Sequence, residues 1–159
     1  MRHASAGILN QPIRIQTFAS SIETGAISYL DFYAATVPPE ATHHTWWRIL
    51  EPAGPMFGRI AAVEGATVGF AICIVHEGTW SMRPTCYLED LFVDPGARGA
   101  GVGRALLDDL VALGGVRSWS SVYWHTRADN ALARKLYDGY LPADDFVRYR
   151  LAIQPQVTD

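Results

Sequence analysis

Several short segments of the chain alternate hydrophobic and polar residues or are rich in β-branched residues, and both patterns predict β-strands. These segments are 13–15, 57–63, 68–75, 86–93, 119–126 and 146–151. The loop around Glu64–Ala66 is short enough to join the second and third segments as an antiparallel hairpin. The pattern therefore predicts a sheet that begins with antiparallel strands.

In other segments the apolar residues recur at helical spacing. Helices are expected at Ile22–Tyr33 after a cap at Ser20 or Ser21, through Trp46–Leu50, from Val102 to Leu113 and from Asn130 to Asp138. In the third helix, Asp108 and Asp109 are expected on the solvent face. The predicted order of elements is β-α-α-β-β-β-α-β-α-β, which belongs to the α+β or mixed α/β class.

Length limits the number of domains. The chain has 159 residues, of which 49% are hydrophobic. A globular chain of this length buries roughly 68–70% of the surface that its unfolded form exposes, which supports one full core. We therefore expect a single domain over residues 1–159.

Charge and cysteine content exclude several classes of protein. Thirteen basic and sixteen acidic residues give a formal net charge of −3, which argues against a nucleic-acid partner. Cys73 and Cys86 are too few for a disulfide framework, and each falls in a predicted strand, where a cysteine acts as a small buried hydrophobe. The sequence shows neither a signal peptide nor a membrane span, and its five histidines lack metal-ligand spacing. A soluble cytoplasmic protein without a bound metal or a membrane partner is expected.

The most informative segment is a predicted strand that runs into a glycine-rich loop and then into a helix. It reads YLEDLFVDPGARGAGVGR from Tyr87 to Arg104. Glycines let the backbone approach a ligand closely, and the N–H groups at a helix start favour an anion such as phosphate. A Walker motif is excluded because Val102 and Gly103 follow Gly101. A dinucleotide fingerprint is excluded because Arg104 stands where Gly or Ala is needed.

Two motifs in the chain resemble the GNAT superfamily of acyl-CoA-dependent N-acyltransferases. Arg98–Gly103 matches the family loop R/Q-x-x-G-x-G/A, and Leu88–Val93 resembles the strand that precedes it there. Asn130–Asp138 looks like the family segment N-x-x-A-x-x-L/F-Y. The resemblance covers residues 68–151 and is nearest to the branch of diamine, polyamine, histone and amino-acid acetyltransferases, although Gly139–Asp145 departs from the usual Gly-Phe ending. It implies the GNAT fold, a mostly antiparallel mixed sheet of about six or seven strands with about four helices.

The resemblance also implies acetyl-CoA as the co-substrate. In GNAT members the CoA pyrophosphate binds backbone N–H groups of the loop, and the pantetheine arm pairs like an added strand with the backbone before it. The residues implied in binding are Leu91, Phe92, Val93, Arg98, Gly99, Ala100, Gly101, Val102, Gly103, Arg104, Asn130 and Tyr137. The alternative for Arg104 is a solvated helix residue, and Asn130 is also expected to cap its helix. A bulge exposes the strand groups in the family, but the sequence does not show one.

Two residues are candidates for acid–base chemistry. By resemblance, Glu89 is the general base for the acceptor ammonium, with Asp90 in reserve; the alternative is a carboxylate that pairs structurally with an arginine. By resemblance, Tyr137 is the general acid that protonates the departing CoA thiolate, because a phenol is mostly protonated at neutral pH. The alternative is an aromatic plug under the short helix. Strict alternation places Tyr87, Glu89, Leu91 and Val93 on one face of the strand, and Leu88, Asp90 and Phe92 on the other.

The function expected from the resemblance is transfer of an acetyl group from acetyl-CoA to a primary amine in a ternary complex. The acceptor is a small amine, polyamine, amino acid or lysine side chain, and the usual family arrangement is a homodimer. The alternative from another class is a non-catalytic acyl-CoA-binding sensor or interaction module. His125 is expected to be a hydrogen-bonded strand histidine rather than an acceptor contact. The aromatic residues Tyr29, Tyr33, Trp46 and Trp47 are expected in the core rather than in a substrate cage. The alternative that the resemblance implies is that one or two of them contact the substrate, because the first two helices border the acceptor groove in this fold.

Overall fold

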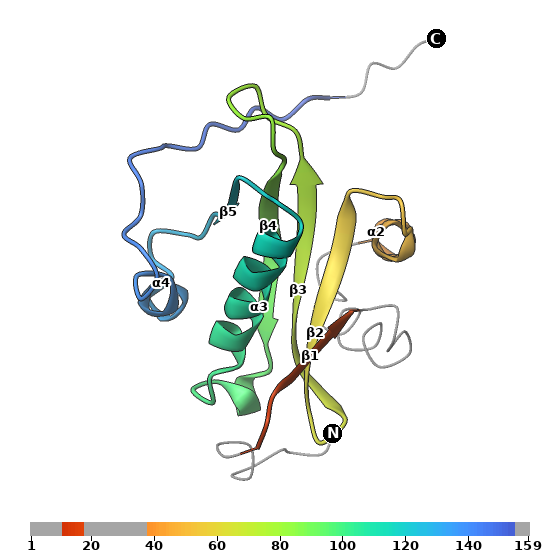
Figure 1. Cartoon of the computed structure of the whole chain (residues 1–159), viewed down its shortest axis with the longest axis vertical. Coiled ribbons are helices and arrows are strands. Elements are labelled where there is room, and N and C mark those ends of the chain that lie inside the picture. The colour runs from red at the N-terminus through yellow and green to blue at the C-terminus, as the bar shows by residue number, and fades with distance from the viewer. Residues whose placement is uncertain (1–10, 18–37, 155–159) are drawn as a thin grey trace. The chain divides into compact units, whose positions relative to one another are not determined.

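The computed structural model describes residues 11–17 and 38–154 (Figure 1). Its elements in chain order are β1 (Arg14–Thr17), α2 (Pro39–Leu50), β2 (Met56–Val63), β3 (Ala66–His76), β4 (Thr85–Val93), the 3-10 helix η3 (Pro95–Ala97), α3 (Val102–Val116), β5 (Ser121–Trp124) and α4 (Ala131–Tyr137). The helix predicted at Ile22–Tyr33 lies outside the described residues. The chain divides into two compact units, one ending at His125 and one beginning at Thr126. The single domain expected from the sequence stays a prediction.

The first unit is built on a mixed sheet with the strand order β1-β2-β3-β4-β5. Neighbouring strands pair antiparallel from β1 to β4, whereas β4 and β5 are parallel. The predicted hairpin is confirmed. Val63 pairs with Ala66, and the two residues between them, Glu64 and Gly65, both have positive φ, at 51° and 81°. Positive φ at both central positions gives the turn the twist of the flanking strands.

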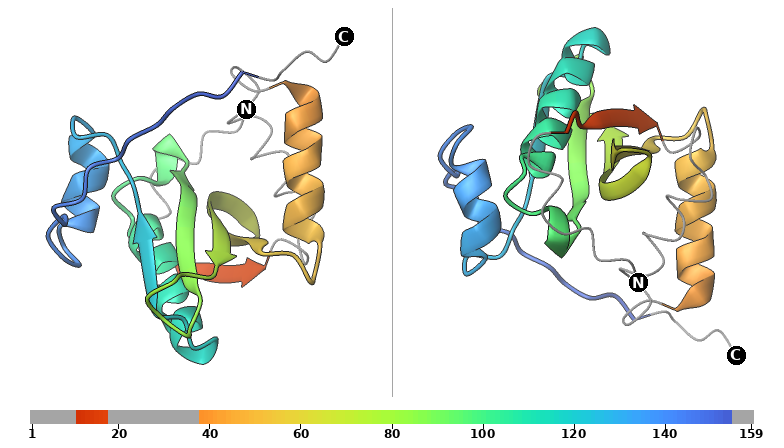
Figure 2. Two further views of the ribbon diagram at one scale, coloured as in Figure 1. Left: turned by 90° about the horizontal axis from the view of Figure 1, so that it is seen from above. Right: turned by 90° about the horizontal axis from the view of Figure 1, so that it is seen from below.

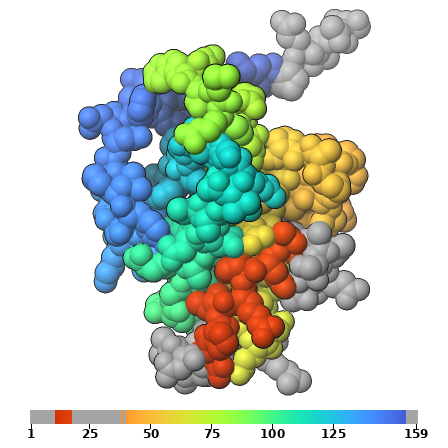
Figure 3. Space-filling view, viewed as in Figure 1, coloured from red at the N-terminus to blue at the C-terminus, as the bar shows by residue number. Residues whose placement is uncertain are grey.

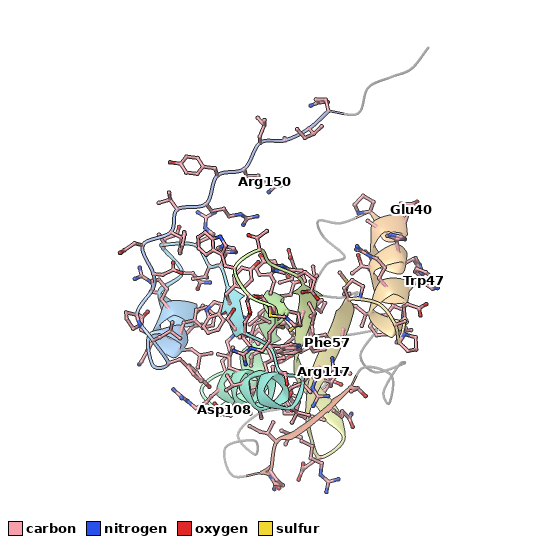
Figure 4. The ribbon with its side chains drawn as sticks, turned by 45° about the horizontal axis from the view of Figure 1, so that its top comes forward. Glu40, Trp47, Phe57, Asp108, Arg117 and Arg150 are labelled. Carbon is pink, nitrogen blue, oxygen red and sulfur yellow. The ribbon has the colours of Figure 1, made fainter. Side chains whose placement is uncertain are left out.

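One face of the sheet is covered by α3. Arg59 on β2 reaches Asp109 on α3 through two hydrogen bonds, Nε to Oδ2 and Nη2 to Oδ1, each 2.7 Å long. Asp109 therefore faces the sheet, and its predicted place on the solvent face is wrong, whereas Asp108 is exposed as predicted (Figure 4). The space-filling view shows α3 lying beside β1 on this side of the unit (Figure 3).

The other face of the sheet packs against α2. Its core cluster contains Ile49 of α2 with Met56, Ile60, Phe70 and Ile72 of β2 and β3, all nearly inaccessible to solvent. Ile60 is the next residue after Arg59, and successive side chains of a strand point to opposite faces. The two helices therefore lie on opposite sides of the sheet (Figure 2). Cys73 and Cys86 are fully buried free thiols, which confirms the prediction for them.

Two predicted strands differ from the structure. The strand expected over 119–126 is shorter, Ser121–Trp124. The strand expected at Phe146–Leu151 is not formed, and its apolar side chains are 72–91% exposed. Alternation specifies two faces of an extended chain, but a strand also needs a partner backbone, which local sequence does not specify. The described residues therefore hold five strands and three α-helices instead of the expected higher counts. None of these helices is long and apolar enough to cross a membrane.

Candidate active site

The register between β3 and β4 shifts by one residue in the middle of β4. Ile72 pairs with Asp90, but the next residue of β3, Cys73, pairs with Leu88. Glu89 is therefore the extra residue of a β-bulge. Bulges bend a strand and redirect side chains, and they are common beside active sites.

The bulge changes which side chains share a face. Tyr87 lies opposite Ile74 and Asp90 lies opposite Ile72. Ile72 and Ile74 are two residues apart in β3 and share the α2 face, so Tyr87 and Asp90 share it too. The prediction that Tyr87 and Asp90 lie on opposite faces of β4 is wrong, because the extra residue shifts the two-residue period by one.

Beyond the bulge, β4 continues without its parallel neighbour. The ladder to β5 pairs Thr85–Leu88 with Ser121–Trp124, while β4 runs on to Val93. Among the strands described, none pairs with this edge of β4 beyond Leu88. The carbonyl of Val93 accepts a hydrogen bond from Nε of Arg98, at 3.3 Å. This bond already uses one lone pair of the Val93 carbonyl, so an extended ligand that paired along Leu91–Val93 as an added strand would share that carbonyl with Arg98 or displace the arginine.

A short, ordered loop connects β4 to α3. Asp94 caps η3, because its Oδ1 accepts from the N–H of Gly96 at 2.7 Å. Ala97, the last residue of η3, is buried, and so is Val102 at the start of α3. The exposed glycines thus lie between two anchored residues, and this limits the freedom of the loop.

The N-terminus of α3 has the geometry of an anion site. Its N-cap is Gly101, with a φ of 85°, and no side chain caps the helix. The first hydrogen bond of the helix runs from the N–H of Ala105 to the carbonyl of Gly101, at 2.9 Å. The N–H groups of residues 102–104 therefore point out of the helix end, where the positive end of the helix dipole adds to them. This arrangement fits a pyrophosphate group.

Two glycines of this loop are needed because of their backbone dihedral angles, and not because a side chain would clash with a neighbour. Gly99 and Gly101 have φ values of 81° and 85°, which side-chain-bearing residues rarely adopt. A Cβ at either position would meet no atom within 4 Å. Between Arg98 and Arg104, the predicted binding residues are three glycines, one alanine and the buried Val102, so few side chains cover the backbone there.

A tyrosine–histidine cluster, formed by His76, Tyr87, Tyr123 and His125, lies across β3, β4 and β5. Tyr87 and Tyr123 are directly opposite in the parallel ladder, and their rings stack with centroids 5.0 Å apart. Nε2 of His76 lies 3.1 Å from the Tyr123 hydroxyl, and Nδ1 of His125 lies 3.4 Å from the Tyr87 hydroxyl. The hydrogen-bond partner predicted for His125 is present, but its predicted place in the strand is wrong, because β5 ends at Trp124.

Glu89 acts electrostatically on this cluster. Burial raises the pKa of Tyr123, and the negative charge of Glu89 raises it further. The Glu89 side chain is exposed to solvent. Sequence analysis did not predict the contacts that join Tyr87, Tyr123 and His76. The sequence does place Tyr87 and Tyr123 in two consecutive predicted strands. It does not show the register between those strands, which sets the two residues opposite each other.

The second unit holds the other two predicted residues. Asn130 caps α4, because its Oδ1 accepts from the N–H of Ala133 at 3.3 Å, and its Nδ2 donates to Oγ1 of Thr126. The predicted helix cap is confirmed. Tyr137 is the last residue of α4 and is partly buried, and burial raises the pKa of its phenol. The phenol is therefore a proton donor rather than a base at neutral pH.

The aromatic residues of α2 have different environments. Trp46 packs against the core cluster, as predicted. The prediction that Trp47 lies in the core is wrong, because its side chain is 63% exposed and stacks on His44 (Figure 4). Tyr29 and Tyr33 lie outside the described residues. Within residues 11–17 and 38–154, no group of three potential metal ligands comes together.

Comparison with known proteins places this geometry in context. The sequence model described as the Acetyltransferase (GNAT) family matches residues 24–140. A D-amino-acid N-acetyltransferase of Saccharomyces cerevisiae is 31% identical over 124 residues, which cover 77% of each chain.

Solved structures share the fold. A ribosomal-protein-alanine N-acetyltransferase from Brucella melitensis has a TM-score of 0.74 at 23% identity, covering 89% of this chain and all of that one. The aminoglycoside N-acetyltransferase AAC(6')-Iy, bound to a bisubstrate analogue that contains CoA, has a TM-score of 0.74 at 20% identity. That match covers 89% of this chain and 99% of the other.

Proposed function

The chain belongs to the GNAT family of acetyltransferases, and we propose that it transfers an acetyl group from acetyl-CoA to a primary amine in a ternary complex. The observation that carries the proposal is the bulge at Glu89. This bulge directly follows Leu88, where the β4–β5 ladder ends, and the rest of β4 leads from it into the glycine loop. A thioester bound along β4 would therefore have a carboxylate beside it.

Backbone groups bind the donor substrate. The N–H groups of residues 102–104 and the backbone of Arg98–Gly101 hold the pyrophosphate, since they form an uncapped helix end. The backbone of Leu91, Phe92 and Val93 pairs with the pantetheine arm. An N–H near Leu91 polarises the thioester carbonyl as negative charge develops on its oxygen.

The reaction needs one base and one acid. Glu89 takes a proton from the acceptor ammonium, and the neutral nitrogen attacks the carbonyl carbon of the thioester. A C–N bond forms, the C–S bond breaks, and the thiolate takes a proton from the Tyr137 phenol. Holding the two substrates together supplies much of the acceleration.

Several classes of amine are candidate acceptors. The name of the yeast relative supports amino acids, and the carboxylates Glu89 and Asp90 near the cluster support cationic acceptors in general. We therefore propose a small-molecule amine and test D-amino acids, polyamines, aminoglycosides and lysine peptides together.

The test measures free-thiol release from acetyl-CoA with this panel and records product masses. A mass shift of one acetyl group on an amine is expected, and it identifies the acceptor class. Glu89→Gln should lower kcat by about 100-fold or more, as expected for loss of a general base. Glu64→Gln, in the hairpin turn, is the matched control and should leave kcat unchanged. Acetyl-CoA binding without thiol release would favour a sensor, and no binding would overturn the assignment of the loop.

A further inference from the structure

The first unit holds a cavity at the end of the sheet where β2 begins and α3 ends. Its volume is about 630 Å³, which is in the range of small-molecule sites. Its walls are mostly apolar and come from the loop after α2, from the sheet and from the end of α3. They include Leu50, Pro55, Phe57, Val75, Leu113 and Trp119. A cavity of this size and lining suits a small organic molecule.

This cavity lies far from the glycine loop. Leu113 and Arg117 line it at the C-terminal end of α3, whereas the proposed pyrophosphate site is at the N-terminal end of the same helix. The helix has 15 residues, which span about 22 Å. A ligand in the cavity would therefore not overlap a pyrophosphate bound at the glycine loop.

The cavity contains an arginine that is stacked on aromatic rings. The guanidinium carbon of Arg117 lies 5.2 Å from the ring centroid of Phe57 (Figure 4). It lies 6.0 Å from the ring centroid of Trp119, and the two rings pair with centroids 5.8 Å apart. Cation–π attraction therefore holds the Arg117 guanidinium at the cavity.

The stacking leaves the N–H donors of Arg117 available to a ligand. These donors lie in the plane of the guanidinium, so a ring against its face does not occupy them. No carboxylate among the described residues forms an ion pair with Arg117. A carboxylate that enters the cavity can therefore accept two parallel hydrogen bonds from this side chain.

The other charged groups of the cavity limit the charge of its ligand. Arg59 lines the cavity, but it donates two hydrogen bonds to Asp109, which neutralises its charge. Glu51 lines the cavity as well, and its carboxylate repels an anion with several negative charges. The cavity therefore favours a singly charged carboxylate over a phosphate monoester, which carries about −1.5 to −2 at pH 7.

We propose that this cavity is a second ligand site, which binds a small monocarboxylate with an aromatic body through Arg117. The carboxylate accepts from the in-plane N–H groups of Arg117, and the aromatic body packs against Phe57, Leu113 and Trp119. The inference goes beyond acetyl transfer and does not rest on the proposed function.

The test follows the indole N–H resonance of Trp119 by NMR while 4-phenylbutyrate is added to the full chain. The carboxylate should bind with a Kd below about 1 mM. Its uncharged analogue, 4-phenylbutyramide, should bind about ten- to a hundred-fold more weakly, because the charge on the hydrogen-bond acceptor is lost. Saturating CoA should leave the Kd of 4-phenylbutyrate unchanged, because the two sites lie at opposite ends of α3.

Variants of Arg117 test its role directly. In Arg117→Gln, the carboxylate should bind as weakly as the amide, while an unchanged Kd of the amide shows that the cavity is intact. Arg117→Lys keeps the charge but lacks the planar fork, so it should restore only part of the difference. The matched control is Arg83→Gln, an exposed arginine of the β3–β4 loop outside the cavity lining, which should behave as wild type. Circular dichroism melting curves check that each variant is folded.

Three results would overturn the proposal. An unmoved Trp119 resonance at about 10 mM 4-phenylbutyrate would show that the cavity does not bind this class of ligand. Equal affinities of the carboxylate and the amide for the wild type would remove the charge of Arg117 from recognition. Displacement of 4-phenylbutyrate by CoA would place the ligand in the donor site instead. Each of these results leaves the proposed function standing, because thiol release from acetyl-CoA tests acetyl transfer separately.

Discussion

Gly69 on β3 lies so close to Val102, the first residue of α3, that a Cβ at Gly69 would be 3.0 Å from Cγ1 of Val102. The same Cβ would be 2.7 Å from the carbonyl oxygen of Phe92 on β4. The absence of a side chain at Gly69 therefore determines how closely the start of α3 approaches the sheet. Because Val102 is in the glycine loop that we assign to CoA, this close contact also positions the loop.

Gly69→Ala should therefore weaken both stability and donor binding. The added methyl group must displace backbone or Val102, and such overpacking costs about 1–3 kcal/mol of unfolding free energy. We expect a lower urea midpoint and a higher KM for acetyl-CoA. Gly78→Ala is the control, since a Cβ there meets nothing within 4 Å, and it should leave both quantities unchanged. If Gly69→Ala had the same urea midpoint as the wild type, α3 would have moved to accommodate the methyl group, and Gly69 would not determine its position.

Gly101→Ala tests the left-handed N-cap of α3. An alanine at a φ of 85° costs about 1–2 kcal/mol, and relief of this strain would turn the N–H groups of the helix end away from the pyrophosphate. The dissociation constant of acetyl-CoA, measured by calorimetry, should rise.

The matched control for this change is Gly115→Ala, in α3 with open space around its Cβ position. It should raise the unfolding free energy by about 0.5–1 kcal/mol, because alanine favours a helix more than glycine does. Equal acetyl-CoA affinity in Gly101→Ala and the wild type would contradict the anion site.

Tyr137→Phe should lower kcat by about 100-fold while the affinity for acetyl-CoA changes little, as expected when a general acid is removed. Rapid-quench measurement of the first turnover detects a slower chemical step directly. Tyr149→Phe serves as the tyrosine control. Unchanged turnover in Tyr137→Phe would leave the phenol with a packing role under α4.

Alkaline pH should destabilise the protein through Tyr123. Its pKa in the folded protein is raised by burial and by Glu89, so above the ordinary phenol pKa of about 10 the unfolded chain loses its proton first. The unfolding free energy contributed by Tyr123 is therefore complete below that pH and is lost as the pH rises toward the raised pKa. Urea midpoints between pH 9 and pH 11 should fall less steeply in Tyr123→Phe than in the wild type. A residual slope is expected because burial raises the pKa of Tyr137 as well.

The Arg59–Asp109 pair joins β2 to α3, and its side chains are only 14% and 21% exposed. Asp109→Asn should lower the unfolding free energy by about 1–3 kcal/mol, because it weakens two charge-assisted hydrogen bonds. Asp108→Asn, the exposed neighbour, should stay within about 0.5 kcal/mol of the wild type. If Asp109→Asn and Asp108→Asn changed the unfolding free energy in urea equally, the Arg59–Asp109 ion pair would not stabilise the fold.

Much of the fold was readable from the sequence. The hairpin around Glu64 and Gly65, the strand before the glycine loop and the helix from Val102 follow from local period and turn chemistry, which involve neighbours in the chain. The Asn130 cap also follows from residues a few positions apart. Residues 146–151 alternate apolar and polar side chains just as clearly but form no strand. A strand needs a neighbouring strand to pair with, and the segment's own sequence does not specify one.

The sequence by itself determined the glycine loop, the candidate carboxylate Glu89 and the resemblance to a family, because residue types and their spacing carry that information. The tertiary structure decided the bulge at Glu89, the shared face of Tyr87 and Asp90, and the contact of His76 with Tyr123. These relationships depend on the register between strands that are distant along the chain. Register is set by the packing of whole strands against their neighbours, and a one-residue step in it reverses every face beyond that point.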